Sequence, residues 1–472
     1  MTNPATPVAG PIVLKFGGTS MGSASLIRRA AQIILDEPPR CARVVVVSAM
    51  GRTTDALLEA AGAAARGERA RWSSAVSRLE AEHLKACREL GSAPGPEDVA
   101  ETIRDQFSRL RDWLEQASTK GWMDGPELDP VSSLGEVCCA ALMVATLRTL
   151  GAASVAVDGK DVILTDSRFG GATPLEDGTR QRIRTLIAPL LEEGTIPVVS
   201  GFRGSTEDGR STTLGRGGSD TTATVIGALL PAREVRIYTD VDGVMTADPR
   251  LVPEARVITT LSYSEAAELA FFGARVLHAN SIEMPRRHQV RVAIRNSFSL
   301  DGTGTMIGPE VASRPGVRAV THTGGARLFT VRGADGVGFS QLAIPILEAL
   351  DWHHVPTLMV TQSSAANVIC LAVAGDHEQR VARELDRLQA HAGVLGSVEM
   401  SQPVGVVVTV GDSMRGTPGI AAKLFTALAE RRINVMAISQ GASELSVSAA
   451  VAETDLVEAV RAIHSAFELD RR

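Results

Sequence analysis

The sequence is poor in cysteine and in aromatic residues. Its 472 residues include five cysteines, and only 4% of them are Phe, Trp or Tyr. Five is an odd number, Cys138 and Cys139 are adjacent, and none of the cysteines has the spacing of a zinc site or of a disulfide framework. We therefore expect free thiols in a reducing compartment such as the cytoplasm.

A surplus of positive charge and a long apolar run are also missing. The formal net charge is −6, and no run of Lys or Arg stands out, which argues against nucleic acid as a partner. No apolar stretch approaches the roughly 20 residues that cross a membrane. The first residues, MTNPATPVAGP, lack the basic start and apolar segment of a signal peptide. We expect a soluble cytoplasmic protein, independent of membranes, with roughly two to four domains.

Polar and glycine-rich residues concentrate between Ile196 and Arg250. A buried strand, a glycine-rich loop, a helix, a second buried strand and an acidic loop are predicted at 196–200, 212–220, 221–230, 235–239 and 240–248. In open α/β sheets, ligands bind beyond the carboxyl ends of the strands. Glycines let backbone N–H groups approach an anion, and a helix N-terminus adds partial positive charge. A solvated turn is the alternative, but two such clusters separated by one helix favour a binding site.

Two side-chain types in this stretch suit a charged ligand. Arg216 can form two parallel hydrogen bonds with a carboxylate or a phosphate. The aspartates after the second strand can hold Mg²⁺ or the polar groups of a nucleotide.

Another glycine-rich turn follows the first predicted strand, which runs from Pro11 to Phe16. It is not a P-loop, because Lys15 precedes the glycines. Backbone amides and one lysine could still face phosphates during their transfer. A surface lysine whose aliphatic stem packs on the protein is the alternative.

Two further stretches could contribute to the same cleft. Ser48 and Thr54 follow an apolar strand at 44–47, although Ser48 could equally cap a helix. Glu136 is the only carboxylate in an apolar helical stretch from Ser132 to Leu150, so it either caps the helix start or faces a ligand.

Taken together, these motifs resemble the aspartate kinase family. The resemblance lies in KFGGTS at Lys15–Ser20 and in GFRG, TTLGRGGSDTTA and TDVDGVMTADPR, which come in the order and spacing of the family. It implies an α/β amino-acid kinase fold, an open and mostly parallel sheet between helices, over residues 1–300. A helical lobe at about 56–128 would be built onto that sheet. The implied reaction transfers the γ-phosphate of ATP, with Mg²⁺, to the side-chain carboxylate of L-aspartate.

The resemblance also implies roles for single residues. Lys15 and Asp220 would be catalytic, and Mg²⁺ would arrive with ATP instead of being held by a protein cage. The residues implied for aspartate are Ser48, Thr54, Glu136, Phe202, Arg216 and Ser219. Those implied for the nucleotide are Lys15, Gly17, Gly18, Thr239, Asp240, Met245, Arg250 and Arg275. Met245 and Arg275 depart from the tyrosine and the lysine that are usual in the family.

The chain beyond about residue 316 has a different pattern. The pattern of residues 322–402 predicts the element order βαββαβ. Residues 403–472 predict the same order without its last strand. The strand predicted at 316–321 would complete the second copy, so that the first copy is nested inside it. Such duplicated units resemble ACT domains, which bind amino acids at paired interfaces and imply at least a homodimer.

The two copies carry parallel polar loops. Gln362 and Gln440 are predicted at equivalent positions, just past a strand, although ordinary hairpin turns would look alike. The loops resemble those of threonine-sensing aspartate kinases. This resemblance implies an amino-acid effector, threonine before lysine, bound near Gln362, Asn434 and Gln440.

The resulting expectation is a monofunctional aspartate kinase that makes 4-phospho-L-aspartate, the first step towards lysine, threonine and methionine, under feedback by an amino acid. Two alternatives stay open. One is a kinase of the same fold for another acidic substrate such as glutamate, and the other is a non-catalytic subunit that senses amino acids.

Overall fold

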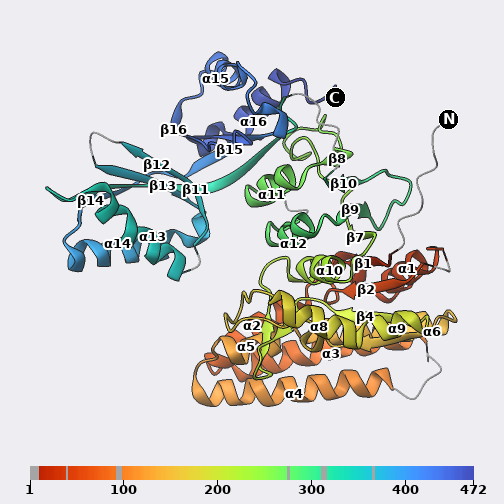
Figure 1. The fold of residues 1–472 in the computed structure, drawn as a ribbon. Coiled ribbons are helices and arrows are strands. Elements are labelled where there is room, and N and C mark those ends of the chain that lie inside the picture. The colour runs from red at the N-terminus through yellow and green to blue at the C-terminus, as the bar shows by residue number, and fades with distance from the viewer. Residues whose placement is uncertain are drawn as a thin grey trace, which may run out of the picture. The chain divides into compact units, whose positions relative to one another are not determined.

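The computed structural model describes residues 10–38, 41–91, 98–273, 277–309, 316–353, 355–363 and 367–471. They fall into two compact units (Figure 1). The first unit comprises Met1–Gly243, Thr259–Tyr263 and Val276–Val311. The second comprises Val244–Ile258, Ser264–Arg275 and Ala312–Arg472.

The first unit is built on an eight-stranded sheet in the order β3-β4-β2-β1-β7-β9-β10-β8. Its strands are β1 (Ile12–Phe16), β2 (Arg43–Val47), β3 (Ser154–Val157), β4 (Ile196–Ser200), β7 (Glu234–Thr239), β8 (Thr260–Leu261), β9 (Arg291–Asn296) and β10 (Thr305–Ile307). The six strands from β3 to β9 in this order are parallel, and β10 runs antiparallel to β9. β5 (Arg203–Ser205) and β6 (Ser211–Thr213) form a separate two-stranded ribbon.

Helices cover both faces of this sheet. The helices of the first unit are α1 (Ala24–Leu35), α2 (Thr53–Ala65), α3 (Arg69–Leu90), α4 (Val99–Lys120), α5 (Gly125–Ser132), α6 (Leu134–Thr149), α7 (Gly159–Val162), α8 (Glu176–Leu186), α9 (Ala188–Glu192), α10 (Gly218–Leu229) and α12 (Asn280–His288). α6 packs on β3 and β4, α10 packs on β1, and α8 and α12 pack on α10. The short 3₁₀ turn η1 (Thr19–Met21) follows β1.

Side chains of β1 alternate between the two faces, as the period of a strand requires. Ile12, Leu14 and Phe16 belong to the core that includes α1, α3, α4 and α6. Val13 and Lys15 point the other way, because Lys15 pairs with a carboxylate on α10. The apolar helix α10 lies close to the sheet, since a Cβ added at Gly227 would meet Val235 Cγ2 at 2.2 Å.

A helical lobe of α2, α3, α4 and α5 extends this core (Figure 1). Its buried apolar residues, such as Phe107 and Leu110, are continuous with those of the sheet. The stretch Gly125–Thr149, which spans α5 and α6, is long and apolar enough to cross a membrane by composition, but 83% of its most apolar window is buried inside the protein. It is therefore a core segment of this unit.

The second unit carries a seven-stranded sheet in the order β12-β13-β11-β15-β17-β16, in which β14 also pairs with β11. Its strands are β11 (Ala319–Gly333), β12 (Thr357–Ser363), β13 (Val368–Val373), β14 (Leu395–Met400), β15 (Val404–Val410), β16 (Val435–Gln440) and β17 (Ser446–Ala452). Its helices are α11 (Tyr263–Phe271, apart from its first residue), α13 (Phe339–Trp352), α14 (Glu378–Ala392), α15 (Ile420–Glu430) and α16 (Leu456–Ala466). Short 3₁₀ turns lie at Gly375–His377, Asp412–Met414 and Glu453–Asp455.

β11 serves both halves of this sheet. Its residues from Ala319 to Ala326 pair with β15, and those from Arg327 to Gly333 pair with β13 and β14. The strand expected at 316–321 and the first strand of the nested copy are thus one continuous strand, which begins at Ala319. Thr305 begins β10, because its pairing with Ile294 in β9 extends the sheet.

The segment Val244–Ile258 packs inside the second unit although its sequence follows β7. Ala247 and Val252 belong to the same hydrophobic core as β15, β17, α15 and α16. The Val320 N–H donates to the Thr246 carbonyl at 2.8 Å, and Thr246 Oγ1 lies 3.0 Å from His464 Nε2. The acidic stretch of the sequence therefore divides after Gly243 between two structural units.

We expect Leu110→Ala in α4 to destabilise the first unit by about 2–5 kcal/mol, because the substitution leaves a cavity in a fully buried core. Arg109→Ala is the matched control, since Arg109 is exposed and forms an ion pair with Asp105 in the same helix. Chemical denaturation measures both variants. If Leu110→Ala matched the control, the continuity of the lobe with the core of the sheet would be wrong.

Candidate active site

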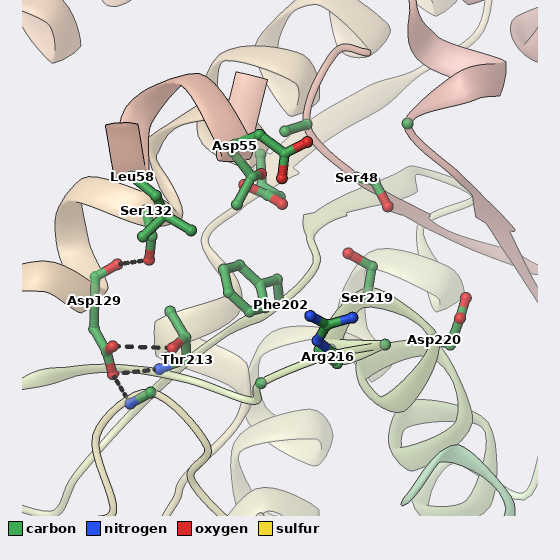
Figure 2. A pocket seen from close by; sticks show the side chains of 18 of the residues that line it. Ser48, Asp55, Leu58, Asp129, Ser132, Phe202, Thr213, Arg216, Ser219 and Asp220 are labelled. Carbon is green, nitrogen blue, oxygen red and sulfur yellow. Dashed lines mark hydrogen bonds between the residues drawn. The ribbon is translucent and has the colours of Figure 1, made fainter. Parts of the chain in front are cut away.

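A cavity of about 630 Å³ opens at the C-terminal ends of β1, β2 and β4. Its size is that of a small-molecule site. The lining residues are Lys15, Gly18, Ser48, Ala49, Gly51, Thr54, Asp55, Leu58, Leu128, Asp129, Ser132, Glu136, Gly170, Phe202, Thr213, Gly215, Arg216, Gly217, Gly218, Ser219 and Asp220. Figure 2 shows ten of these side chains labelled around the cavity. The structure thus brings together Lys15, Gly18, Asp220 and all six residues that the sequence implied for aspartate.

A buried ion pair lies at the edge of this cavity. Lys15 Nζ is 2.5 Å from Asp220 Oδ1, and the two residues are only 7% and 9% exposed. Asp220 lies in the first turn of α10, where the helix end favours a negative charge. Lys15 is therefore not a surface lysine, which was the alternative from the sequence.

The loop before α10 has a tightly constrained backbone. Gly217 has φ +70°, and a Cβ added at Gly218 would lie 2.5 Å from Phe202 Cδ2. Phe202 itself has φ +69°, a conformation that costs a non-glycine residue about 1–3 kcal/mol. Its N–H donates to Thr222 Oγ1 at 3.0 Å, and its carbonyl accepts from the Leu214 N–H at 2.9 Å. These contacts fix the backbone of Phe202, whose side chain lines the cavity together with that of Arg216 (Figure 2).

Arg216 and Glu136 present opposite charges to the cavity. Arg216 is exposed and forms no ion pair with any of the described residues. Glu136 is 3% exposed, and its Oε2 has no hydrogen-bond partner within the described part of the chain. Burial raises the pKa of Glu136 to about 7, against the opposing effect of backbone N–H groups and of Arg203. An arginine and a carboxylate with free hydrogen-bonding capacity suit a ligand that carries both a carboxylate and an ammonium group.

Arg203 is a residue whose role sequence reasoning missed. Its Nε donates to Asp158 Oδ1 at 2.8 Å, and its Nη1 donates to Ser133 Oγ at 2.8 Å. Ser133 joins α5 to α6, the helix that carries Glu136. The GFRG motif contained this arginine, but its letters alone did not indicate that the guanidinium is buried.

Asp129 was also missed. It precedes Pro130 inside α5, lines the cavity and is 2% exposed. No sequence motif marked it, because its partners Gly170 and Thr213 are distant along the chain.

Three of the residues implied for the nucleotide lie next to this cavity without lining it. The Gly17 N–H donates to the Tyr238 carbonyl at 3.1 Å, so the ends of β1 and β7 are adjacent. Thr239 and Asp240 follow Tyr238, and Thr239 Oγ1 donates to Asp240 Oδ1 at 3.1 Å.

The remaining three residues implied for the nucleotide do not belong to the described part of the first unit. Met245 and Arg250 belong to the second unit, where Met245 forms a bridge with Val257 and Arg250 pairs with Asp248 at 2.6 Å. Arg275 lies outside the described residues.

The residues implied for the effector lie on edge strands of the second unit. Gln362 is within β12 and Gln440 is the last residue of β16, so both are inside strands and not just past them. Asn434 comes directly before β16. All three side chains are exposed.

A family model described as the amino acid kinase family matches residues 10–296, and an ACT domain model matches residues 407–467. The chain belongs to the amino acid kinase family. The expected fold class, a kinase fold followed by ACT domains, is thereby confirmed.

The curated relatives of this family member include aspartokinases of full length. It is 33% identical over 471 residues to an aspartokinase of Mycolicibacterium smegmatis, which covers 97% of this chain and 96% of the relative. It is 32% identical over 467 residues to aspartokinase 2 of Bacillus subtilis, which covers 98% of each. A bifunctional aspartokinase/homoserine dehydrogenase 2 of Arabidopsis thaliana is 33% identical over 97% of this chain. The chain spans about half the length of that and similar bifunctional relatives.

A solved structure of E. coli aspartokinase III in complex with aspartate and ADP is similar to this family member, with a TM-score of 0.85 at 27% identity over 97% of this chain and 100% of the other. The same enzyme in complex with lysine and aspartate gives a TM-score of 0.75, over 96% of this chain and 99% of the other.

We expect the stability of the protein relative to a Glu136→Gln variant to depend on pH. The pKa of Glu136 is raised from 4.5 in the unfolded chain to about 7 in the folded protein. Ionisation therefore disfavours the folded state as the pH rises through this range. Between pH 4.5 and pH 8, the variant should gain about 3 kcal/mol relative to the unchanged protein. Chemical denaturation at several pH values measures this difference.

Glu207→Gln serves as a control, because Glu207 is exposed on the surface of the same unit. A stability difference for Glu136→Gln that stayed constant from pH 4.5 to pH 8 would contradict the raised pKa.

Proposed function

We propose that this protein is an aspartate kinase. It transfers the γ-phosphate of ATP to the side-chain carboxylate of L-aspartate and releases ADP and 4-phospho-L-aspartate. The observation that carries the proposal is one cavity in which Arg216, Glu136 and the Lys15–Asp220 pair lie together. Among the described residues, the Arg216 guanidinium has no ion pair and Glu136 Oε2 has no hydrogen-bond partner. The aspartokinase names of full-length relatives support the same reaction.

The substrate would be oriented by its two backbone charges. Arg216 would bind the α-carboxylate of aspartate, and the free oxygen of Glu136 would accept hydrogen bonds from its ammonium group. The side-chain carboxylate would then point towards Lys15. Ser48, Thr54, Phe202 and Ser219 line the remaining walls and would limit the length of the substrate.

The chemical step needs no general base, because a carboxylate is already ionised at neutral pH. One carboxylate oxygen forms a bond to the γ-phosphorus while the bond from that phosphorus to the bridging oxygen breaks. Positioning of the two reactants and stabilisation of negative charge then carry catalysis. Lys15 Nζ is the cationic group at the cavity that can stabilise the transferring phosphoryl group.

The residues present fit a Mg²⁺ ion that arrives on the nucleotide. No cluster of three His, Cys, Asp or Glu that could hold a metal occurs among the described residues. Mg²⁺ in kinase sites is commonly held by phosphates with one or two carboxylates, and Asp220 at the cavity wall is suited to be one of these. When bound, the ion would neutralise charge on the β- and γ-phosphates. Gly17, Gly18, Thr239 and Asp240 would contact the nucleotide, and the roles of Met245, Arg250 and Arg275 stay predictions.

We also propose that an amino-acid effector, threonine or lysine, binds at the edge strands β12 and β16 near Gln362, Asn434 and Gln440. The exposure of these side chains and the ACT match support this assignment. The lysine complex of E. coli aspartokinase III belongs to a similar chain. Assembly into at least a homodimer, a cytoplasmic location and the pathway served stay predictions.

The direct test is release of ADP from Mg-ATP with L-aspartate, with L-glutamate as the substrate control. We expect turnover that requires aspartate and that glutamate does not support. Turnover with glutamate alone would favour the alternative kinase. No turnover with either would favour a non-catalytic sensing subunit.

We expect Lys15→Met to lower kcat with aspartate by about 10²–10³-fold, because it removes the cation that stabilises the transferring phosphoryl group. Steady-state kinetics measure this effect. Lys85→Met, on the exposed face of α3, is the matched control and should leave kcat unchanged. A Lys15→Met variant with nearly full kcat would rule out this role.

We expect Gln362→Ala and Gln440→Ala to weaken inhibition by the effector without lowering the uninhibited rate. The measurement is aspartate-dependent ADP release titrated with threonine and, separately, with lysine. Full inhibition in both variants would show that the effector binds elsewhere.

A further inference from the structure

We propose that Asp129 is a positioning residue for the substrate-carboxylate site, because its carboxylate fixes the strand that leads to Arg216. The inference rests on the proposed function and assigns a role to a buried carboxylate that is not expected to touch the substrate.

Both carboxylate oxygens of Asp129 are used by two segments of the cavity wall (Figure 2). Oδ2 accepts the Thr213 N–H at 2.8 Å and the Gly170 N–H at 3.0 Å. Oδ1 accepts the Thr213 hydroxyl at 3.0 Å. Three donors on one buried carboxylate form a rigid connection, because each is a hydrogen bond to a charged acceptor.

The connection reaches Arg216 over a short length of chain. Thr213 ends β6, and Arg216 follows three residues later. The Ala172 N–H also donates to the Thr213 carbonyl at 2.8 Å. A Cβ added at Gly215 would lie 3.3 Å from the Gly170 carbonyl oxygen, so the turn that Asp129 holds packs directly on the residue before Arg216. Asp129 thereby fixes both the start of the arginine loop and the surface beneath it.

Asp129 is itself held firmly. Its backbone carbonyl accepts hydrogen bonds from the hydroxyls of Ser132, at 3.2 Å, and Ser133, at 2.7 Å. Ser133 is the residue that Arg203 binds at the start of the helix bearing Glu136. Helix α5 and the residue that follows it therefore support both charges proposed to bind the substrate, Arg216 through Asp129 and Glu136 through Ser133.

The arrangement argues against a direct role in substrate binding. The side-chain oxygens of Asp129 already accept from Thr213 and Gly170, and the residue is 2% exposed. Burial raises the pKa of this carboxyl, while its three hydrogen-bond donors oppose that effect. An asparagine of the same shape could keep all three contacts, since its carbonyl oxygen could accept both N–H groups and its amide could donate to the Thr213 hydroxyl.

The experiment compares Asp129→Ala with Asp129→Asn and with Thr212→Val in the full chain. Thr212 is the matched control, because it lies in the same strand and its hydroxyl lies 2.7 Å from Thr165 Oγ1, away from Asp129. We expect Asp129→Ala to raise the KM for aspartate about tenfold or more, with the KM for ATP changed less than about twofold. Asp129→Asn should stay within about threefold and so rescue the alanine variant. Thr212→Val should leave both KM values unchanged while lowering the melting temperature.

A second variant guards against misfolding. Thr213→Val removes only the hydroxyl contact and should raise the KM for aspartate two- to threefold. If Asp129→Ala raised both KM values equally, or no more than Thr212→Val, the positioning role would be overturned.

A readout without turnover separates this inference from the proposed reaction. Backbone amide hydrogen exchange over residues 213–218 should be at least tenfold faster in Asp129→Ala and unchanged in Thr212→Val. If the unchanged protein did not phosphorylate aspartate, the proposed function would fail. The exchange rates would still show whether Asp129 fixes residues 213–218. Equal exchange in Asp129→Ala and the unchanged protein would overturn the inference.

Discussion

The buried ion pair between Lys15 and Asp220 is the constraint on which the first unit depends. Two opposite charges 2.5 Å apart are removed from water, and each compensates the other, because either charge alone would be costly to bury. That geometry requires the register of β1 in the middle of the sheet and the first turn of α10 close to its end. The close approach of Gly227 to Val235 brings the helix near enough for the pair to form.

The rest of the cavity is arranged around this pair by shorter connections. Arg203 links the start of α6 to Asp158, and Asp129 links α5 to the strand before Arg216. Arg203 acts through the Asp158 carboxylate and the Ser133 hydroxyl, and Asp129 acts through two backbone N–H groups and a hydroxyl. The charged groups that face the cavity are thus placed by buried polar contacts, which are directional, and not by apolar packing alone.

Much of this could be predicted from the sequence, because the relevant signals are local. Apolar runs marked β1, β2, β4 and β7, and Lys15, Ser48 and Phe202 near the ends of the first three line one cavity. Lys15 was singled out because a lysine at the end of a buried strand has few structural explanations. The βαββαβ order predicted for the nested copy is found in the second unit as β11, α13, β12, β13, α14 and β14.

What could not be predicted depends on contacts between distant segments. Asp129 meets Thr213 across 84 positions, and no pattern near either residue indicates the contact. The acidic stretch looked continuous, yet Val244–Ile258 packs with the second unit, because Ala247 and Val252 supply apolar side chains to that core. β10 was not predicted, because its three residues are too few to show an alternating pattern.

A double-mutant cycle on Lys15 and Asp220 tests the central claim most directly. Lys15→Met, Asp220→Asn and the double variant would be compared by kcat/KM for aspartate and by the free energy of unfolding. If the ion pair is needed for both folding and catalysis, each single substitution should strongly lower kcat/KM and the free energy of unfolding. The double variant should be little worse than either single variant, so that the two effects are strongly non-additive. Strictly additive effects in both measurements would show that the two residues act independently, and would contradict this account.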